Sequence, residues 1–324
     1  MVEQRIRNAK VVGSTPALGN PFKLNVSEEN GVCSQINESL QNLSLKNYIR
    51  KNALELNSLT NLSEENFQFL FNYKIIILGE IHGINETPEM ILGIIKLLSA
   101  LKRHIILAIE VWDSQQDLFE KFMQTGNIEL LKNSIFFKNT PQYGLGSLAM
   151  VKLLQQVRKI SDVEVFCFDS FSLESKATNL KERISLSQDR DFQMAQKLGT
   201  KIKENENKTI IVITGGVHAS TQINSILGFD YKPMGYWLSH AENLCSADIF
   251  SILLKFERGE SFGGISKNGI DITYGVHEMD PIIDDYSQAL NLDRYFLTFD
   301  KKREGHDAIF FNRKITASFP LITP

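Results

Sequence analysis

Cysteine is scarce in this sequence, and the absence of several familiar patterns narrows the possible classes of protein. The three cysteines, Cys33, Cys167 and Cys245, are odd in number and far apart, so neither a disulfide framework nor a CxxC metal site is indicated. Cys167 lies in the apolar run VEVFCFD and is predicted to fill the core, because free cysteines are often buried.

Long apolar runs are also absent. No stretch reaches the roughly 18 uninterrupted apolar residues of a membrane-spanning helix, and the N-terminal residues lack the apolar core of a secretory signal. We therefore expect a cytoplasmic protein with no membrane span, while export without a cleavable signal stays open.

Neither sign of charge is in large excess. The sequence has 35 Lys and Arg and 38 Asp and Glu, which gives a net charge of -3. This balance provides no field that would attract nucleic acid, so no such partner is expected. Residues 1–45 are polar, rich in Asn, Ser and Glu, and predict a loosely ordered N-terminal arm. Residues 46–324 are long enough for a single α/β domain with a substantial core.

Several catalytic motifs are missing. The sequence has no G-x-S-x-G nucleophile elbow and no Walker A motif, which argues against an ordinary serine α/β-hydrolase and a P-loop enzyme. Gly144, Gly146 and Ala149 match G-x-G-x-x-A, with Asp169 further along, as in a dinucleotide fingerprint. Pro141 and its polar neighbours stand where a strand should run into the glycines, so a dinucleotide site is not expected.

The apolar residues predict an alternation of strands and helices. Near-continuous runs rich in Ile and Val predict strands at 74–79, 104–111, 163–169 and 209–215. Helical patterns occupy 87–102, 114–125, 147–160, 187–205 and a segment near 219–228. The alternation predicts a doubly wound, mainly parallel sheet with helices on both faces. Segments 248–257 and 307–315 predict extra C-terminal edge strands, which could be antiparallel, with a long loop between them.

Acidic residues and histidines follow the predicted strands at corresponding places. Glu80 and His82 follow the first strand, Glu110 ends the second, Asp169 ends the third and His218 follows the fourth. Because the carboxyl ends of parallel strands share one edge of the sheet, these side chains are expected to converge. A carboxylate beside an imidazole suits either metal binding or water activation, so this edge is the candidate site of an enzyme.

Each of these residues also has a purely structural interpretation. Asp169 is a suitable residue to start a turn. Glu110 stands among apolar residues, where an unpaired carboxylate is costly, so it needs a partner. The two glycines before His218 allow either close approach of a ligand or a tight turn. Arg190 and Asp191, in the first turn of their predicted helix, are either a solvated pair or part of the site, where Arg190 would clamp a carboxylate or a substrate oxygen.

A resemblance to a known superfamily rests on motifs in a fixed order: LGEIHGINETPE, LAIE, SLAMVKLLQQVR, FD, RDFQMAQKL and GGVHAS. Over about residues 74–220 the chain resembles the superfamily of erythromycin esterase-like proteins, haem-binding ChaN lipoproteins and Tiki metalloproteases. The resemblance implies a layered α/β domain and ester hydrolysis, metal-dependent peptide cleavage or haem binding. The site residues that it implies are Glu80, His82, Glu110 and His218, with Arg190 and Asp191 in support.

The leading hypothesis is a hydrolase that acts on the ester or peptide bond of a small-molecule or peptide substrate. Water would be activated either by a Glu/His pair or by zinc, manganese or iron bound to His82, His218, Glu80 or Glu110. Arg190 would stabilise the developing oxyanion. The supporting residues are Glu86, Asp169 and Asp191.

Two alternatives belong to other classes. The chain could bind haem or another large ligand without catalysis, with Tyr143, Tyr236 and Trp237 as an apolar wall and His240 as the axial ligand. It could also be an interaction domain that binds a partner through the arm at residues 1–45. The sequence predicts neither the substrate nor the oligomeric state.

Overall fold

The fold was analysed in a computed structural model. The structure describes residues 44–139, 144–170, 177–226, 228–242, 244–266 and 272–322. Almost all of the predicted arm, residues 1–45, lies outside these ranges, as does Tyr143. The arm and the boundary of the 46–324 domain therefore stay predictions.

A mainly parallel sheet of nine strands forms the centre of the described part of the chain. Its middle strands are β2 (Ile75–Glu80), β3 (His104–Trp112), β4 (Val163–Asp169) and β5 (Lys208–Gly215). They lie in the order β2-β5-β3-β4, and every neighbouring pair is parallel. These four strands are the ones that the Ile- and Val-rich runs predict, so their carboxyl ends share one edge.

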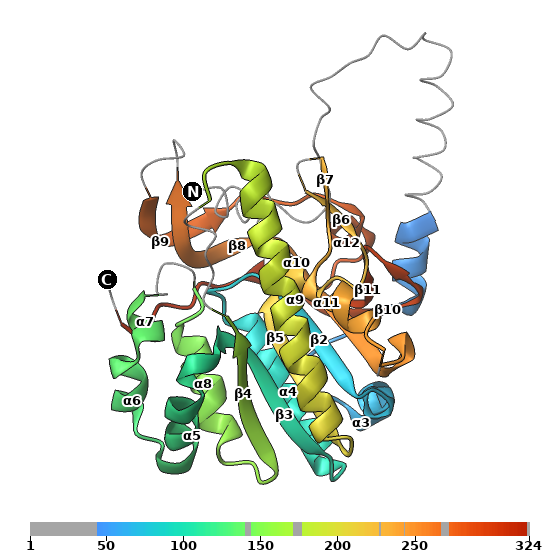
Figure 1. The fold of residues 1–324 in the computed structure, drawn as a ribbon. Helices are drawn as coiled ribbons and strands as arrows, with labels where there is room; N and C mark the ends of the chain where they lie inside the picture. Colours follow the sequence, from blue (N-terminus) through green and yellow to red (C-terminus); the bar gives the residue numbers. More distant parts are fainter. Residues whose placement is uncertain are drawn as a thin grey trace.

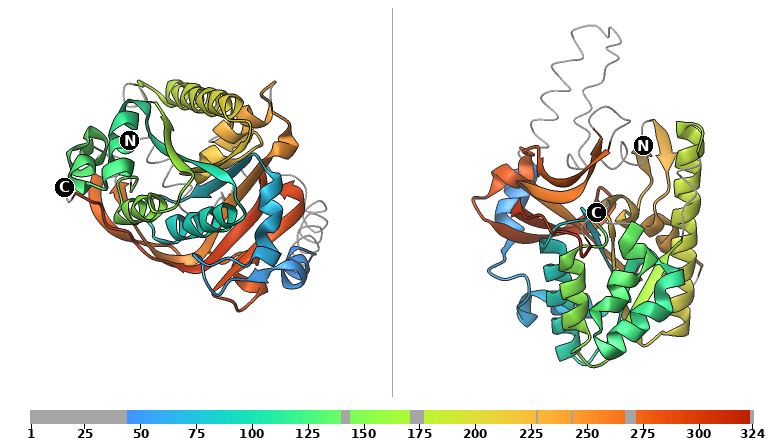
Figure 2. Two further views of the ribbon diagram at one scale, coloured as in Figure 1. Left: turned by 90° about the horizontal axis from the view of Figure 1, so that it is seen from below. Right: turned by 90° about the vertical axis from the view of Figure 1, so that its left-hand side faces the viewer.

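Helices cover both faces of the sheet, as predicted. One face packs against α4 (Glu86–Ala100), α5 (Gln116–Thr125) and α8 (Leu148–Val157), and the other against α9 (Leu180–Glu204) and α11 (Met234–Ser239). The view from below in Figure 2 shows α9 separated from α4 and α8 by the sheet. Along β3, Leu107 and Ile109 join the first core, whereas Ile106 and Ala108 join the second. Strands that are apolar on both faces are what such a layered sheet requires.

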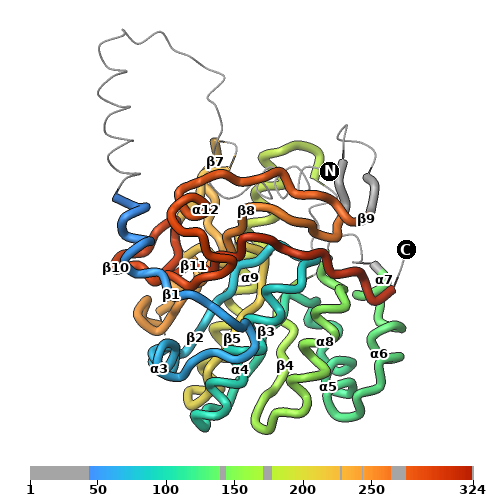
Figure 3. Tube along the Cα trace, turned by 180° about the vertical axis from the view of Figure 1, so that it is seen from behind, coloured from blue at the N-terminus to red at the C-terminus, as the bar shows by residue number. Residues whose placement is uncertain are grey.

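The C-terminal strands widen the sheet beyond β2. β8 (Ile249–Ser266) lies parallel to β2, and β11 (His306–Ile315) lies parallel to β8. β10 (Arg294–Arg303) and β1 (Leu54–Glu55) complete this edge in antiparallel pairing, and β9 (Ile272–Met279) pairs with the far half of β8. Figure 3 shows these strands from behind. The extra strands were predicted.

Two details of the prediction for the later part are wrong. The expected long loop between 257 and 307 contains β9, α12 (Asp285–Ala289) and β10. The helix expected near 219–228 is instead the one-turn α10 (Gly216–Ala219) followed by a hairpin of β6 (Asn224–Ile226) and β7 (Phe229–Tyr231). Gly228 in this hairpin has φ +83°, a conformation that favours glycine. In β10, only Tyr295, Phe296 and Leu297 form a buried apolar run, which is too short to reveal a strand.

The remaining elements lead into the sheet or connect its helices. Residues 44–52 are helical, and α3 (Glu64–Phe67) with the short helix η1 (Gln68–Asn72) precedes β2. Two small helices, α6 (Ile128–Asn133) and α7 (Ile135–Asn139), follow α5. Helix α9 begins at Leu180 rather than at 187, because Asn179 caps it by accepting a hydrogen bond from the Glu182 backbone N–H at 2.9 Å. None of the helices in the described ranges combines the length and apolarity needed to cross a bilayer.

Candidate functional site

The polar side chains at the strand ends come together on one edge of the sheet. Glu80 ends β2, Glu110 lies near the end of β3, Asp169 ends β4 and His218 lies in α10 directly after β5. Their side chains are between 1% exposed for Glu110 and 11% for His218. Because buried charges are stable only when they are paired, the contacts between these residues define the site.

Glu110 lies at the centre of this cluster. Its Oε1 accepts a hydrogen bond from Arg190 Nη2 at 2.7 Å. Its Oε2 accepts from the Thr214 hydroxyl at 2.7 Å and from the Gly215 backbone N–H at 2.8 Å. These three donors fix the orientation of the carboxylate and meet its need for partners inside the protein.

Arg190 is held by a second carboxylate. Its Nε donates to Asp169 Oδ1 and its Nη2 donates to Asp169 Oδ2, both at 2.8 Å. This paired geometry fixes the plane of the guanidinium. The arginine is therefore a buried clamp between Asp169 and Glu110, not a solvated surface charge. Its contacts position Glu110, and the oxyanion contact expected for Arg190 stays a prediction.

His82 is oriented by Glu80. The His82 Nδ1 lies 2.8 Å from Glu80 Oε1, although β2 ends at Glu80 and His82 lies in the following loop. Burial raises the pKa of Glu80, and the hydrogen bond to His82 opposes that rise. A carboxylate at Nδ1 favours the tautomer with the proton on Nδ1 and the lone pair on Nε2. The Nε2 lies 3.7 Å from Glu110 Oε2 and therefore faces the centre of the cluster.

His218 has its own carboxylate partner in Asp191 of α9. The His218 Nδ1 lies 2.5 Å from Asp191 Oδ1, and its Nε2 lies 3.9 Å from Glu110 Oε1. Asp191 Oδ2 accepts hydrogen bonds from the Tyr231 hydroxyl at 2.9 Å and the Met234 backbone N–H at 3.1 Å. Burial acts to lower the pKa of His218, but the Asp191 and Glu110 carboxylates outweigh it and raise the pKa above its ordinary value.

The two imidazoles face one small region beside Gly215. A methyl group placed on Gly215 would lie 3.3 Å from His218 Cδ2, 3.4 Å from His82 Nε2 and 3.9 Å from Glu110 Oε2. Two carboxylate-histidine pairs thus flank one central carboxylate. The glycine leaves room for a reacting atom next to both rings, which is the close approach that the paired glycines in the sequence suggested.

The loop that carries His82 is anchored by the C-terminal segment. The Gly83 carbonyl accepts a hydrogen bond from the Ser318 backbone N–H at 2.8 Å. The buried Glu86 accepts from the Thr316 backbone N–H at 3.0 Å and from its hydroxyl at 2.6 Å. Glu86 therefore faces this segment and supports the loop rather than taking part in the cluster.

Gly144, the first glycine of the dinucleotide-like pattern, packs against the same loop. It has φ +74°, and a methyl group on it would lie 2.5 Å from the Gly83 nitrogen and 2.7 Å from the His82 carbonyl carbon. Backbone packing beside the site thus requires a glycine at position 144.

Tyr236 and His240, predicted to bind a cofactor, lie apart from the cluster on and just after α11. Their rings stack with centroids 4.0 Å apart, and His240 Nδ1 lies 2.8 Å from the Tyr236 carbonyl oxygen. Within the described ranges, neither residue has a recorded contact with the strand-end cluster. The haem site built on them stays a prediction that the arrangement of the cluster does not support.

The metal site predicted on His82, His218, Glu80 and Glu110 is not shown. Among the residues that the structure describes, no three His, Cys, Asp or Glu side chains form a group that could hold one. Both Glu110 oxygens already accept protein hydrogen bonds, and the Arg190 guanidinium pairs with one of them.

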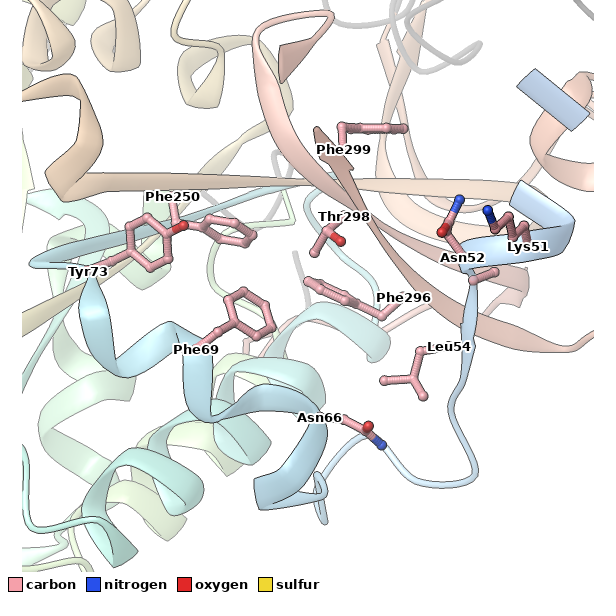
Figure 4. Close-up of a pocket in the computed structure, with 11 residues that line it drawn as sticks. Lys51, Asn52, Leu54, Asn66, Phe69, Tyr73, Phe250, Phe296, Thr298 and Phe299 are labelled. Carbon is pink, nitrogen blue, oxygen red and sulfur yellow. The ribbon is translucent and has the colours of Figure 1, made fainter. Parts of the chain in front are cut away.

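A cavity of about 530 Å³ lies elsewhere, between β10, the start of β8 and the segment before β2 (Figure 4). Aromatic rings form much of its wall, and they pack on one another, with ring centroids 4.8 Å apart for Tyr73 and Phe250 and 5.4 Å for Phe69 and Phe250. Lys51 is the single charged residue of this wall among the described residues. Because the wall offers no acid-base pair, the strand-end cluster is the candidate active site.

The sequence analysis missed two residues that shape the cluster, Thr214 and Tyr231. Thr214 stands at the end of a predicted strand, a position at which a hydroxyl can meet the site, so a signal for it exists. Tyr231 lies in a hairpin that was predicted as helix, and no spacing links it to Asp191. Its role depends on the packing of β7 against α9.

The raised pKa of His218 gives a pH-dependent contribution to stability. In the folded chain Asp191 and Glu110 stabilise the imidazolium, so this contribution is complete below the unfolded pKa of about 6.5. It is lost as the pH rises through the higher folded pKa. We expect the free energy of unfolding of the wild type to fall over this range in denaturant titrations, and the fall to shrink in His218→Gln. An equal pH slope in His218→Gln and in the surface control His104→Gln would contradict this.

Comparisons with known proteins agree with the fold. No protein-family model matches the sequence, and no curated protein matches it. Among solved structures, a mutant of the erythromycin esterase EreC in its open conformation is similar, with a TM-score of 0.61 and 13% identity over 82% of this chain and 97% of that one. A Bacillus cereus protein has a TM-score of 0.59 and 14% identity over 87% of this chain and 99% of that one.

This chain therefore has the erythromycin esterase-like α/β fold, and the resemblance expected from the sequence is confirmed at the level of the fold. ChaN of Campylobacter jejuni, in a structure with cofacial haem, shows a weaker likeness, with a TM-score of 0.38 and 13% identity over 66% of this chain and 91% of that one. That likeness is too weak to support haem binding here, and the resemblance to Tiki proteases stays a prediction.

Proposed function

We propose that this protein is a hydrolase of ester or peptide bonds in which His82 activates water without a metal ion. The proposal rests on one arrangement of side chains. Glu80 pairs with His82, Asp191 pairs with His218, and both rings lie beside Glu110. A base, a positively charged group and a fixed carboxylate beside one open position are the parts that hydrolysis needs. The fold shared with EreC, an esterase by its description, is consistent with this activity.

His82 is the general base in this scheme. Glu80 holds Nδ1, which leaves the Nε2 lone pair facing the space beside Gly215. Nε2 takes a proton from water as the water oxygen bonds to the substrate carbonyl carbon and the carbonyl π electrons move onto its oxygen. The carboxylates of Glu80 and Glu110 stabilise the imidazolium that results. When the tetrahedral intermediate collapses, this imidazolium returns the proton to the leaving group.

His218 carries the complementary role. Its raised pKa favours the protonated ring, whose Nε2–H can donate to the oxygen on which negative charge develops. Glu110 holds both rings in place by charge, and Arg190 and Asp169 hold Glu110. Arg190 is accordingly a positioning residue, and the substrate carbonyl lies between the two imidazoles.

A substrate panel tests the proposal together with a variant of the site. Purified protein is assayed against p-nitrophenyl esters and fluorogenic peptides, with and without EDTA, and we expect hydrolysis that EDTA does not abolish. Gly215→Ala places a methyl group 3.3 to 3.4 Å from both rings, while its φ of -58° suits alanine. Shifting the rings by a few tenths of an ångström is expected to lower kcat about tenfold with little change in Tm.

The matched control is Gly199→Ala in α9, where the added methyl group meets no atom within 4 Å. This control should keep wild-type turnover. Absence of hydrolysis across the panel, or unchanged kcat in Gly215→Ala, would count against the proposed site.

A further inference from the structure

Arg183 of α9 is a buried cation with two guanidinium nitrogens that lack a hydrogen-bond partner among the described residues. The residue is 9% exposed, and its Nε and Nη1 are shielded from water without a hydrogen-bond partner. Among the residues that the structure describes, no carboxylate forms an ion pair with it. An unpaired buried charge is among the most costly features a fold can carry, so its presence calls for an explanation.

The helix places Arg183 above the candidate active site. Arg190 marks the level of the strand ends, because its guanidinium binds Asp169 at the end of β4. Arg183 precedes it by two helical turns, on the same side of α9 and about 10 Å further along the axis. Figure 1 shows that α9 continues past the ends of β4 and β5 in this direction. Arg183 therefore belongs to the part of α9 that overhangs the site.

The neighbouring residues tie this turn of α9 to the catalytic histidine. Ile184 forms a small apolar cluster with Ile226 and Tyr231, and Val217 packs against that cluster. Val217 directly precedes His218 in α10. The turn that carries Arg183 is thus fixed against the element that carries His218, so the backbone of Arg183 has a set position relative to the catalytic histidine.

The carboxylates of the site suggest a role for Arg183 in binding an anion. The cluster holds four carboxylates, Glu80, Glu110, Asp169 and Asp191, and its cations, Arg190 and His218, already face them. An anionic substrate would be repelled unless a further cation received its charge. A guanidinium donates paired hydrogen bonds to a carboxylate or phosphate, and its strength rises where water is excluded.

From these observations we propose that Arg183 binds an anionic group of the substrate, remote from the bond that is cleaved. The substrate class is then an ester or amide that carries a carboxylate or phosphate on the order of 10 Å from the scissile bond, by the two-turn spacing. This inference builds on the proposed hydrolase function, and it specifies which substrates that site selects.

Matched substrates test the inference. Mono-p-nitrophenyl azelate and p-nitrophenyl nonanoate have the same chain, but only the first ends in a carboxylate, at the separation that the two-turn spacing requires. We expect the wild type to prefer the azelate ester in kcat/KM by about tenfold or more, because hydrogen bonds to charged groups are strong. The preference should disappear in Arg183→Gln through a higher KM for the anionic ester. The control Lys181→Gln removes an exposed cation two residues away and should keep the preference.

A second measurement does not depend on turnover. Arg183→Met removes an uncompensated buried charge, so its Tm should lie above that of the wild type. Azelate or inorganic phosphate should raise the Tm of the wild type and of Lys181→Gln but not that of Arg183→Met. A response to phosphate alone would identify the anion as a phosphate, and a response to azelate alone would identify it as a carboxylate.

The two proposals can fail separately. If neither ester is hydrolysed but an anion stabilises the wild type and not Arg183→Met, the hydrolase function is wrong and the anion site stands. If esters are hydrolysed without preference and no anion shifts the Tm, the hydrolase function stands and the role of Arg183 is refuted. A lower Tm in Arg183→Met without any anion response would likewise show that the arginine is structural.

Discussion

Replacing His82 by Gln is expected to lower kcat by about 10²- to 10⁴-fold on any substrate that the wild type hydrolyses, the range that a positioned general base contributes. The physical reason is that an amide cannot accept the proton of water as an imidazole Nε2 does. Glutamine can still donate a hydrogen bond to Glu80, so the loop after β2 should keep its position. The measurement is steady-state kinetics with the best ester of the panel, together with the Tm of each variant.

The control for this experiment is His104→Gln, which alters a histidine on the opposite edge of the sheet. The His104 side chain is 59% exposed and pairs with Asp162. We expect kcat of this variant to equal that of the wild type. A His82→Gln enzyme that retains more than about a tenth of wild-type kcat, with the same Tm, would show that another group is the base.

The convergence of the site could be predicted because it follows from topology. Four apolar runs that are buried on both faces predict parallel strands, and parallel strands place their carboxyl ends on one edge. Glu80, Glu110, Asp169 and His218 could therefore be brought together although the chain separates them widely. Glu110 could also be expected to need a partner, since its neighbours are apolar.

The pairing within the site could not be predicted, because it depends on side-chain directions that no spacing encodes. Asp191 reaches His218 only because α9 packs beside α10, and Tyr231 reaches Asp191 only because β7 is a strand. The metal site was predicted from the types of donor present. The structure shows that Arg190, Thr214 and Gly215 already donate hydrogen bonds to Glu110, and residue types cannot reveal this.

The C-terminal segment illustrates the same limit at longer range. Glu86 was predicted as a supporting residue of the site. In the structure it accepts hydrogen bonds from the backbone N–H and hydroxyl of Thr316, across most of the length of the chain. A contact between residues so far apart in the sequence cannot be predicted from local patterns. A strand can be, because its pattern lies within a few consecutive residues.

The buried clamp gives the largest expected effect on stability. Arg190→Met should lower the free energy of unfolding by about 3–5 kcal/mol, because it leaves two buried carboxylates without their cation. The side chains of Glu110 and Asp169 are only 1% and 3% exposed, so water cannot replace the guanidinium. Denaturant unfolding of the wild type and the variant measures the difference.

A surface ion pair serves as the matched control for that loss. Lys208→Met removes the cation of the Lys208 and Glu164 pair, whose Glu164 side chain is 53% exposed, and should cost no more than about 1 kcal/mol. Adding Glu110→Gln and Asp169→Asn to Arg190→Met should recover part of the stability, because the uncompensated negative charges are then gone. Two outcomes would contradict the prediction: an equal loss in the free energy of unfolding for Arg190→Met and Lys208→Met, or no recovery when the two neutral residues are added. Either would show that Arg190 does not hold the two carboxylates as the structure implies. Glu110 would then lack the fixed orientation on which both histidines depend.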